Sequence, residues 1–321
     1  MPQPVLALDI GGTKLAGGVV TPAGEMLREQ TSATDPAATP GDVIEALLEL
    51  SGQVLAGAGL RLHDLSAVGI SFGGPVDYPN GLVITCHHLA GWEGVPLRDI
   101  IAERTDLPTV MDNDANAAAL GELVFGAGRG CRHLIYVTVS TGIGAGLVID
   151  GKVHRGANSM AGELGHTHLV PYGPKCTCGR LGCLESVASG WAVAKAAQDA
   201  LDTGAASALR SVPRADLSAR HVMEMAQTDA LAARIVNQAG EYLGLGMARA
   251  VNLLNPDVVA IGGGISQAGE VLMAPVRRGF ARYVMPETAQ GVRIVTSELS
   301  PRWGLFGAAA LALREAPATR L

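Results

Sequence analysis

Residues 5–20 read VLALDIGGTKLAGGVV, two short apolar runs on either side of a glycine-rich polar turn. The runs Val5–Leu8 and Leu15–Val20 have the composition of β-strands, and the turn Asp9–Lys14 contains the glycines that a tight reversal needs. These residues are therefore predicted to form a β-hairpin with an unusually polar tip.

The same pattern occurs a second time near the middle of the chain. An apolar run at Leu134–Val139 leads into the turn Ser140–Gly144, and another apolar run follows at Ala145–Ile149. Recurrence of one supersecondary unit indicates an internal duplication, with one hairpin in each of two lobes. We expect a ligand to bind between the two glycine-rich tips.

Length and composition agree with a two-lobed enzyme. The chain has 321 residues, about twice the length of a typical domain. Hydrophobic residues make up 48% and charged residues 17%, which excludes intrinsic disorder. A net charge of −6 offers no positive field for a phosphate backbone, so we expect no nucleic-acid partner. The 42 glycines and the low aromatic content favour an α/β fold.

The remaining elements are placed by apolar spacing and by helix-stop signals. Helices are expected at 42–55, 97–103, 115–125, 221–254 (one or two helices broken by glycines) and 308–314, with further strands at 67–71, 109–111 and 257–261. We divide the chain into an N-terminal α/β lobe, residues 1–113, completed by a C-terminal helix at about 305–321, and a larger α/β lobe, residues 114–304.

The N-terminus carries no targeting signal. The residues MPQPVLALDI lack the basic start and apolar core of a secretory signal, and no apolar run is long enough to span a membrane. We therefore expect a cytoplasmic protein with no membrane partner.

Three glycine-rich turns follow apolar strands: DIGGTK (9–14), STGIGAG (140–146) and IGGGIS (261–266). Glycines let backbone N–H groups approach phosphate oxygens, and the Thr and Lys side chains add donors. The alternative is that each turn merely ends a strand, and neither the Rossmann nor the P-loop fingerprint fits the spacing. The candidate phosphate-site residues are Asp9, Gly11, Gly12, Thr13, Lys14, Thr141, Gly142, Gly144, Gly262, Gly263 and Gly264.

Two carboxylates at strand ends are candidates for chemistry. Asp9 precedes Gly-Gly-Thr, where it can hold Mg²⁺ directly or through water; the alternative is a cap of the turn. Asp114 lies at the start of an Ala-rich helix and is the best candidate for a general base, with Asn113 orienting the acceptor. The alternative is that Asp114 only caps the helix, and Asp112 competes with it for the role of base.

A metal-type cluster follows. His166, Cys176, Cys178 and Cys183 supply one imidazole and three thiols in the segment 166–183, the composition of a structural zinc site. His168 is a competing ligand, and free thiols or a local disulfide are the alternatives.

Two acidic residues flank this segment. Glu163 and Glu185 are suited to hydrogen-bonding several sugar hydroxyls if a metal holds the loop between them; the alternative is that both are solvated surface charges. His166 can serve both purposes, with one ring nitrogen on zinc and the other on the substrate.

These motifs together resemble the ROK group of sugar kinases and sugar-sensing repressors. They are DIGGTK, GGPVD (73–77), DNDANAAALGE (112–122), STGIGAG, GELGH (162–166), CTCGRLGCLE (176–185) and NPDVVAIGGG (255–264), and they span nearly the whole chain. The resemblance implies a two-lobed actin-like, ribonuclease-H-like ATPase fold with ATP between the hairpins and a hexose in an interlobe cleft. The implied sugar contacts are Gly74, Asn113, Asp114, Glu163, His166 and Glu185, with Asp114 as base and with His166, Cys176, Cys178 and Cys183 on zinc.

The resemblance also favours one branch of the family. Repressors of this group carry a helix-turn-helix domain before the first hairpin, and Asp9 leaves no room for one here. We therefore expect an ATP- and Mg²⁺-dependent kinase with structural Zn²⁺ that phosphorylates the 6-hydroxyl of a hexose, most simply glucose. His88 replaces an Asn common in related kinases, so an N-acetylhexosamine or fructose kinase, or a non-catalytic sugar sensor, remains the alternative. A homodimer or homotetramer is expected.

Overall fold

The computed structural model describes residues 3–86 and 89–317 and divides into two compact units. The first unit comprises the described residues up to Gly130, Gly146–Ala161 and those from Arg302 onward; the second comprises Cys131–Ala145 and Gly162–Pro301. The boundaries deduced above, 1–113 with 305–321 and 114–304, remain our proposal for the domains.

The first unit is built on a five-stranded sheet with the order β3-β2-β1-β4-β7. β1 pairs antiparallel with β2, and parallel pairing joins β1 to β4 and β4 to β7. The strands are β1 (Val5–Ile10), β2 (Lys14–Val20), β3 (Met26–Ala33), β4 (Val68–Phe72) and β7 (Thr109–Asn113). The predicted N-terminal hairpin is therefore confirmed.

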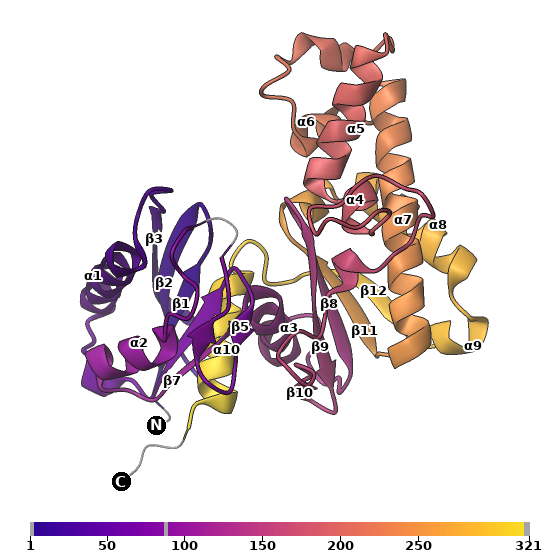
Figure 1. Cartoon of the computed structure of the whole chain (residues 1–321). Coiled ribbons are helices and arrows are strands. Elements are labelled where there is room, and N and C mark those ends of the chain that lie inside the picture. Colours follow the sequence, from indigo (N-terminus) through magenta and orange to yellow (C-terminus); the bar gives the residue numbers. More distant parts are fainter. Residues whose placement is uncertain (1–2, 87–88, 318–321) are drawn as a thin grey trace. The chain divides into compact units, whose positions relative to one another are not determined.

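Helices cover both faces of this sheet because alternate residues of β1 are apolar in both directions. Leu6 and Leu8 pack in one core with α1 (Pro40–Ala58) and α2 (Leu97–Thr105), whereas Val5 and Ala7 pack on α10 (Trp303–Glu315). Figure 1 shows α1 and α10 on opposite sides of these strands. The C-terminal helix begins five residues before the predicted start at 308.

Helix α1 has clear boundary signals. Thr39 and Asp42 form a reciprocal capping box and Pro40 occupies the first turn, while Gly59 ends the helix in a left-handed conformation. These signals extend α1 beyond the predicted 42–55, because the capping residues lie outside the apolar stripe.

The second sheet repeats the plan of the first. Its order is β10-β9-β8-β11-β12, with β8 and β12 each parallel to β11. The strands are β8 (Leu134–Val139), β9 (Ile143–Ile149), β10 (Lys152–Val153), β11 (Val258–Gly262) and β12 (Arg293–Thr296). In chain order both sheets read third, second, first, fourth, fifth, which confirms the duplication predicted from the two hairpins.

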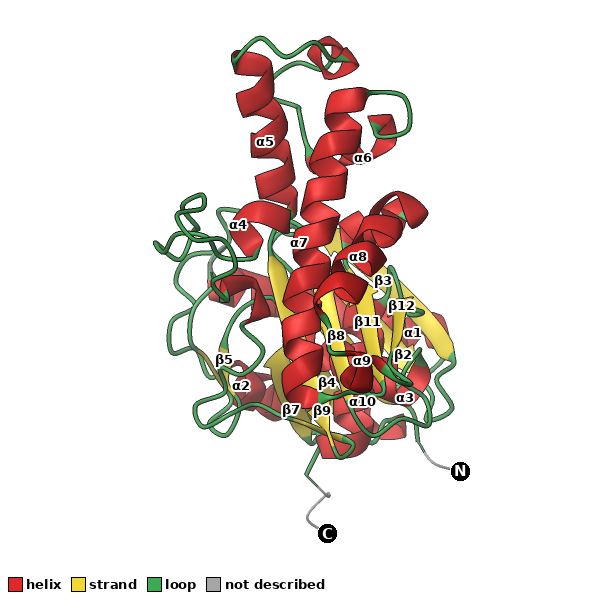
Figure 2. Cartoon of the chain, turned by 90° about the vertical axis from the view of Figure 1, so that its right-hand side faces the viewer, coloured by secondary structure: helices red, strands yellow, loops and turns green. Residues whose placement is uncertain are grey.

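Six helices accompany the second sheet in the described part of the chain. They are α4 (Glu185–Ala188), α5 (Gly190–Asp202), α6 (Ala219–Met225), α7 (Ala230–Leu254), α8 (Glu270–Tyr283) and α9 (Pro286–Ala289). Figure 2 shows α7 and α8 in front of β8 and β11, so this pair covers one face of the sheet. Of these helices, α6 and α7 fall in the predicted helical range 221–254, whereas α4, α5, α8 and α9 had no expected counterpart.

Two helices, α6 and α7, fall in the range 221–254, which confirms the expectation of two helices, but they separate at residues 226–229, where there is no glycine, and the glycines of α7 do not break it. A Cβ at Gly244 would lie 2.2 Å from the carbonyl oxygen of Val276 in α8, so the absence of a side chain lets the two helices pack closely. The predicted end at Leu254 is confirmed, and Asn255 caps the helix in the left-handed conformation. Within residues 3–86 and 89–317, no helix combines the length and apolar character that crossing a membrane requires.

Candidate functional site

The strand-to-helix junction of the first unit carries Asn113 and Asp114. β7 ends at Asn113 and α3 (Asp114–Phe125) begins at the next residue. The Asn113 side-chain oxygen accepts the Ala115 N–H at 3.0 Å, so Asn113 is the N-cap. Its amide group donates to the Gly74 carbonyl at 3.1 Å, which brings these two predicted sugar contacts together.

Asp114 has the electrostatics of a base that works near neutral pH. Burial, with a further contribution from the Asp9 carboxylate, raises the pKa of Asp114 to about 7. Its Oδ1 accepts the Ala115 N–H at 2.8 Å, and the side chain keeps partial solvent exposure. A carboxyl of this kind can accept a proton from a substrate hydroxyl.

Asp9 lies in the same unit at the end of β1. The Ser71 hydroxyl donates to Asp9 Oδ1 at 2.8 Å. Burial raises the pKa of Asp9, opposed by the Ser71 hydrogen bond and the Lys14 charge. A Cβ at Gly304, at the start of α10, would lie 2.3 Å from Asp9 Cγ, so glycine is required beside this carboxylate. The donor set suits Mg²⁺, which prefers carboxylate and water oxygens.

Asp112, the competing candidate for the base, is occupied otherwise. Its side chain is 1% exposed. Oδ2 accepts from Arg155 Nε at 2.8 Å, while Oδ1 accepts from the Asn113 N–H at 2.8 Å and from Asn116 Nδ2 at 3.0 Å. Both oxygens are therefore engaged, which favours Asp114 as the reactive carboxylate.

The tip of the first hairpin presents polar groups to solvent. Gly11 N–H donates to the Lys14 carbonyl at 2.9 Å, which closes the turn. Thr13 and Lys14 are exposed, and Gly11 and Gly12 are partly exposed. These four residues are accessible to an anion.

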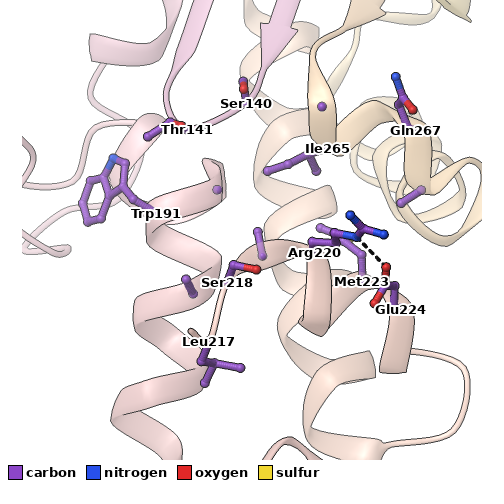
Figure 3. A pocket seen from close by; sticks show the side chains of 15 residues that line it. Ser140, Thr141, Trp191, Leu217, Ser218, Arg220, Met223, Glu224, Ile265 and Gln267 are labelled. Atoms are coloured by element: carbon purple, nitrogen blue, oxygen red, sulfur yellow. Dashed lines mark hydrogen bonds and ion pairs between the residues drawn. The ribbon is translucent and has the colours of Figure 1, made fainter. Parts of the chain in front are cut away.

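A cavity of about 760 Å³ lies in the second unit (Figure 3). It is lined by Ser140, Thr141, Gly190, Trp191, Ala194, Leu217, Ser218, Ala219, Arg220, Met223, Glu224, Gly264, Ile265, Gln267 and Ala268. The structure thus brings the second and third glycine-rich turns together at Thr141 and Gly264. The volume is that of a small-molecule site.

Four predicted phosphate-site glycines do not line this cavity. Gly142 lies before β9 and Gly144 within it, Gly262 ends β11, and Gly263 follows β11. Gly263 has a φ of 87°, and a Cβ there would lie 2.4 Å from the Val139 carbonyl oxygen, so the close approach of these two backbones requires glycine.

The cavity wall formed by α6 and the residues before it was missed by sequence reasoning. Apolar side chains of Leu217, Met223 and Ile265 form much of the surface, and the Arg220 Nε–Glu224 Oε1 pair at 2.7 Å lies at one side (Figure 3). No local motif marks these residues, because they reach the glycine-rich turns only through the tertiary fold.

The Cys and His side chains of the segment 166–183 converge on one point. His166, Cys176, Cys178 and Cys183 each offer a ligand atom, all within 4.8 Å of one another. The Cys176 Sγ–His166 Nδ1 distance is 3.5 Å and the Cys178 Sγ–Cys183 Sγ distance is 3.7 Å.

These separations fit a tetrahedral zinc ion. Zn–S bonds of about 2.3 Å and Zn–N bonds of about 2.0 Å place two sulfurs about 3.8 Å apart, and a sulfur and a nitrogen about 3.5 Å apart. The cysteines are free thiols, and 3.7 Å far exceeds a disulfide bond. Among the described residues the cluster includes His166 and not His168, whose side chain is exposed.

The predicted sugar contacts of the second unit surround this cluster. His166 Nε2, the nitrogen that faces away from Cys176, lies 3.9 Å from Glu163 Oε2. Glu185 is 8% exposed; its Oε1 accepts from Thr177 Oγ1 at 3.0 Å and its Oε2 from the Ile143 N–H at 3.0 Å. Glu185 therefore connects the Cys-rich loop to the second glycine-rich turn. His88 lies outside the described residues.

The sequence profile of the ROK family matches residues 5–315. The chain belongs to the ROK family. Glucokinase from Thermotoga maritima is 36% identical over 312 residues, which cover 96% of this chain and 96% of that protein.

Solved ROK structures share the fold, which confirms the expected actin-like α/β ATPase class. A ROK family glucokinase from Streptomyces griseus, in complex with glucose and AMPPNP, has a TM-score of 0.80 and 34% identity, covering 96% of this chain and 99% of that chain. A ROK family transcriptional regulator, a homologue of the E. coli MLC protein, has a TM-score of 0.86 and 29% identity, covering 96% of this chain and 77% of that chain.

Proposed function

We propose that this chain is a sugar kinase of the glucokinase type, which transfers the terminal phosphoryl group of ATP to the 6-hydroxyl of a hexose, with glucose preferred. The observation that carries the proposal is Asp114, a carboxyl with a pKa of about 7 at a strand-to-helix junction, in a chain related to glucokinases over nearly its whole length. A carboxylate that is half ionised at neutral pH combines availability with basicity.

Asp114 is the proposed general base, which accepts the proton of the 6-hydroxyl as its oxygen attacks the terminal phosphorus and the bond to ADP breaks. Asn113 and Gly74 are proposed to orient the sugar together with Asp114. Glu163, His166 and Glu185 are the further proposed sugar contacts. The proton thus moves to a side chain of this protein, while ADP leaves with the former bridging oxygen.

The three glycine-rich turns are the proposed nucleotide-binding segments. Thr141 and Gly264 lie in the cavity of the second unit, whose apolar walls suit the adenosine part of ATP. Gly11, Gly12, Thr13 and Lys14 offer N–H, hydroxyl and ammonium donors for phosphate oxygens. Asp9 would hold the Mg²⁺ that accompanies the nucleotide and that neutralises phosphate charge.

His166, Cys176, Cys178 and Cys183 would hold a structural zinc ion, since their ligand atoms lie within 4.8 Å of one another and the two separations of 3.5 and 3.7 Å match a tetrahedral site. We also propose a cytoplasmic homodimer or homotetramer, in keeping with the use of ATP and with the symmetry common to soluble proteins.

A coupled assay of ADP release with a panel of sugars tests the function. We expect release that depends on sugar and is fastest with glucose. Asp114→Asn should lower turnover by about 10²–10⁴-fold and leave glucose binding within a few fold. Near-normal turnover of that variant would remove Asp114 from the role of base.

A sugar-sensing protein is the second candidate, favoured by the similarity to a transcriptional regulator. Such a protein binds hexose but releases no ADP in response to it. The same assay separates the two, and the sugar panel also distinguishes glucose from N-acetylhexosamine or fructose kinases.

A further inference from the structure

Arg155 is the centre of a buried charged cluster that the proposed chemistry does not use. Its side chain is 15% exposed. Its Nε donates to Asp112 Oδ2 at 2.8 Å, its Nη2 donates to Glu315 Oε2, and its guanidinium stacks 3.5 Å from the centre of the Tyr78 ring. These contacts together restrict the Arg155 side chain to one orientation.

The surroundings hold Arg155 in that orientation. The Tyr78 hydroxyl donates to Glu315 Oε2 at 2.8 Å, and the Tyr78 N–H donates to Ser159 Oγ at 3.3 Å. The Ala161 N–H donates to the Arg155 carbonyl at 3.0 Å. The loop after β10 and the last turn of α10 are therefore joined through one guanidinium, all within the first unit.

Asp112 transmits this restraint to the residues proposed to act on the sugar. Its Oδ2 takes the Arg155 bond, and its Oδ1 takes the N–H of Asn113 at 2.8 Å and Asn116 Nδ2 at 3.0 Å. A rotation of the carboxylate would break both bonds on Oδ1. The orientation of Asp112 thus determines where the backbone of Asn113 enters α3, one residue before Asp114.

The buried charges of Arg155 and Asp112 each need the other as a partner. Asp112 is 1% exposed, and a buried carboxylate without a partner is strongly disfavoured. Burial opposes the charge of Arg155, but the Asp112 and Glu315 carboxylates outweigh it and raise the Arg155 pKa, so the guanidinium stays charged.

We propose that Arg155 is a positioning residue, which holds the Asp112 carboxylate so that Asn113 and Asp114 keep the geometry that phosphoryl transfer to the sugar requires. The kinetic consequence rests on the proposed kinase function, whereas the restraint on residues 112–114 does not.

Hydrogen exchange tests the restraint directly on the full chain loaded with zinc. In Arg155→Met we expect faster exchange in peptides that cover residues 109–117, and near-normal protection elsewhere in the first unit. Arg104→Met is the matched control, since it also removes two Arg–carboxylate hydrogen bonds, both with Glu45, on the surface of the same unit. Unchanged protection at 109–117 in Arg155→Met would overturn the proposal.

Kinetics test the consequence. Arg155→Met should lower kcat/KM for the sugar by about 10- to 100-fold, since small misplacement of reacting groups has effects of this size. The affinity for AMPPNP should stay within about twofold of the wild-type value. Such a change is well below the tenfold loss expected for the sugar, where tenfold corresponds to about 1.4 kcal/mol. Arg155→Lys should recover only part of the loss, because an ammonium cannot bridge two carboxylates with the same fork. Full recovery by Lys, or equal losses for sugar and nucleotide, contradicts a positioning role.

A double variant separates positioning from simple charge neutralisation. Arg155→Met combined with Asp112→Asn removes the unpaired buried charge, so thermal stability should recover while the sugar kinetics stay impaired. If activity recovers together with stability, Arg155 only neutralises Asp112 and the proposal fails. If the wild-type chain releases no ADP with any sugar, the proposed function fails, and the exchange experiment still decides the role of Arg155.

Discussion

At the scale of single residues, the protonation of Asp114 controls the proposed chemistry. A general base works only when deprotonated, and burial with the nearby Asp9 charge raises the pKa of Asp114 to about 7. As the pH falls through this value, the protonated fraction grows and the base is lost.

We therefore expect kcat/KM for the sugar to fall on the acid side of about pH 7, by about tenfold per pH unit well below it. A pH profile from roughly pH 5 to pH 9 measures this limb. Asp216→Asn, a change at an exposed carboxyl, should show the same fall in kcat/KM on the acid side. A limb near pH 4, the ordinary range of a carboxyl, contradicts the argument from burial.

Gly304 leaves the room that the side chain of the second proposed functional carboxylate, Asp9, occupies. A Cβ there would lie 2.3 Å from Asp9 Cγ and 2.4 Å from both carboxylate oxygens. Gly304→Ala should displace Asp9, raise the KM for Mg-ATP by about tenfold or more, and leave glucose affinity unchanged, since a displaced metal ligand typically has effects of 10- to 100-fold.

Gly52→Ala is the control, because nothing lies within 4 Å of a Cβ at this position in α1 and alanine favours helices. Normal use of Mg-ATP by Gly304→Ala would show that Asp9 does not hold the metal.

At the scale of elements, the Cys-rich loop supports Glu185. Thr177, between two of the cysteines, donates to Glu185 Oε1 at 3.0 Å. Loss of the metal should therefore loosen a proposed sugar contact as well as the loop itself.

Cys178→Ser should reduce bound zinc from one equivalent to a small fraction by elemental analysis, and should weaken glucose binding by about tenfold or more. Cys131→Ser, outside the cluster, should do neither. Full glucose affinity in a zinc-free preparation of the wild-type protein would separate Glu185 from the metal and contradict this link.

At the scale of the whole molecule, the chain returns to the first unit at its end. Ala308, Ala309 and Ala312 of α10 lie in one buried core with Val5 and Ala7 of β1, so residues about 300 positions apart complete one layer. The first sheet therefore cannot bury that face until α10 has been made.

Ala309→Asp places a charge at a position with 0% exposure. We expect a loss of about 3–5 kcal/mol in the free energy of unfolding of the first unit, since the charge has no partner. Urea titration followed by fluorescence measures it, and Arg314→Gln, at an exposed position of the same helix, is the control. Unfolding at the wild-type urea concentration would contradict the placement of α10.

Local patterns were sufficient where chemistry and contacts lie close in the chain. The two hairpins, the strand-to-helix junction at Asn113–Asp114 and the grouping of His166 with three cysteines were all predicted, because the spacing of a few residues already determines their geometry. The end of α7 at Asn255 is a further case, since a left-handed cap is a property of the residues themselves.

Tertiary structure alone decided the rest. The cavity wall from α6 and the contact of Arg155 with Glu315, 160 residues away, join segments whose side chains carry no local signal of their partners. Tertiary structure also distinguished Asp114 from Asp112: Asp112 is buried and bonded to Arg155, whereas Asp114 is partly exposed and accepts the Ala115 N–H. The physical reason is that spacing along the chain encodes backbone geometry over a few residues, whereas burial and the partners of a charge depend on elements that meet only when the chain has folded.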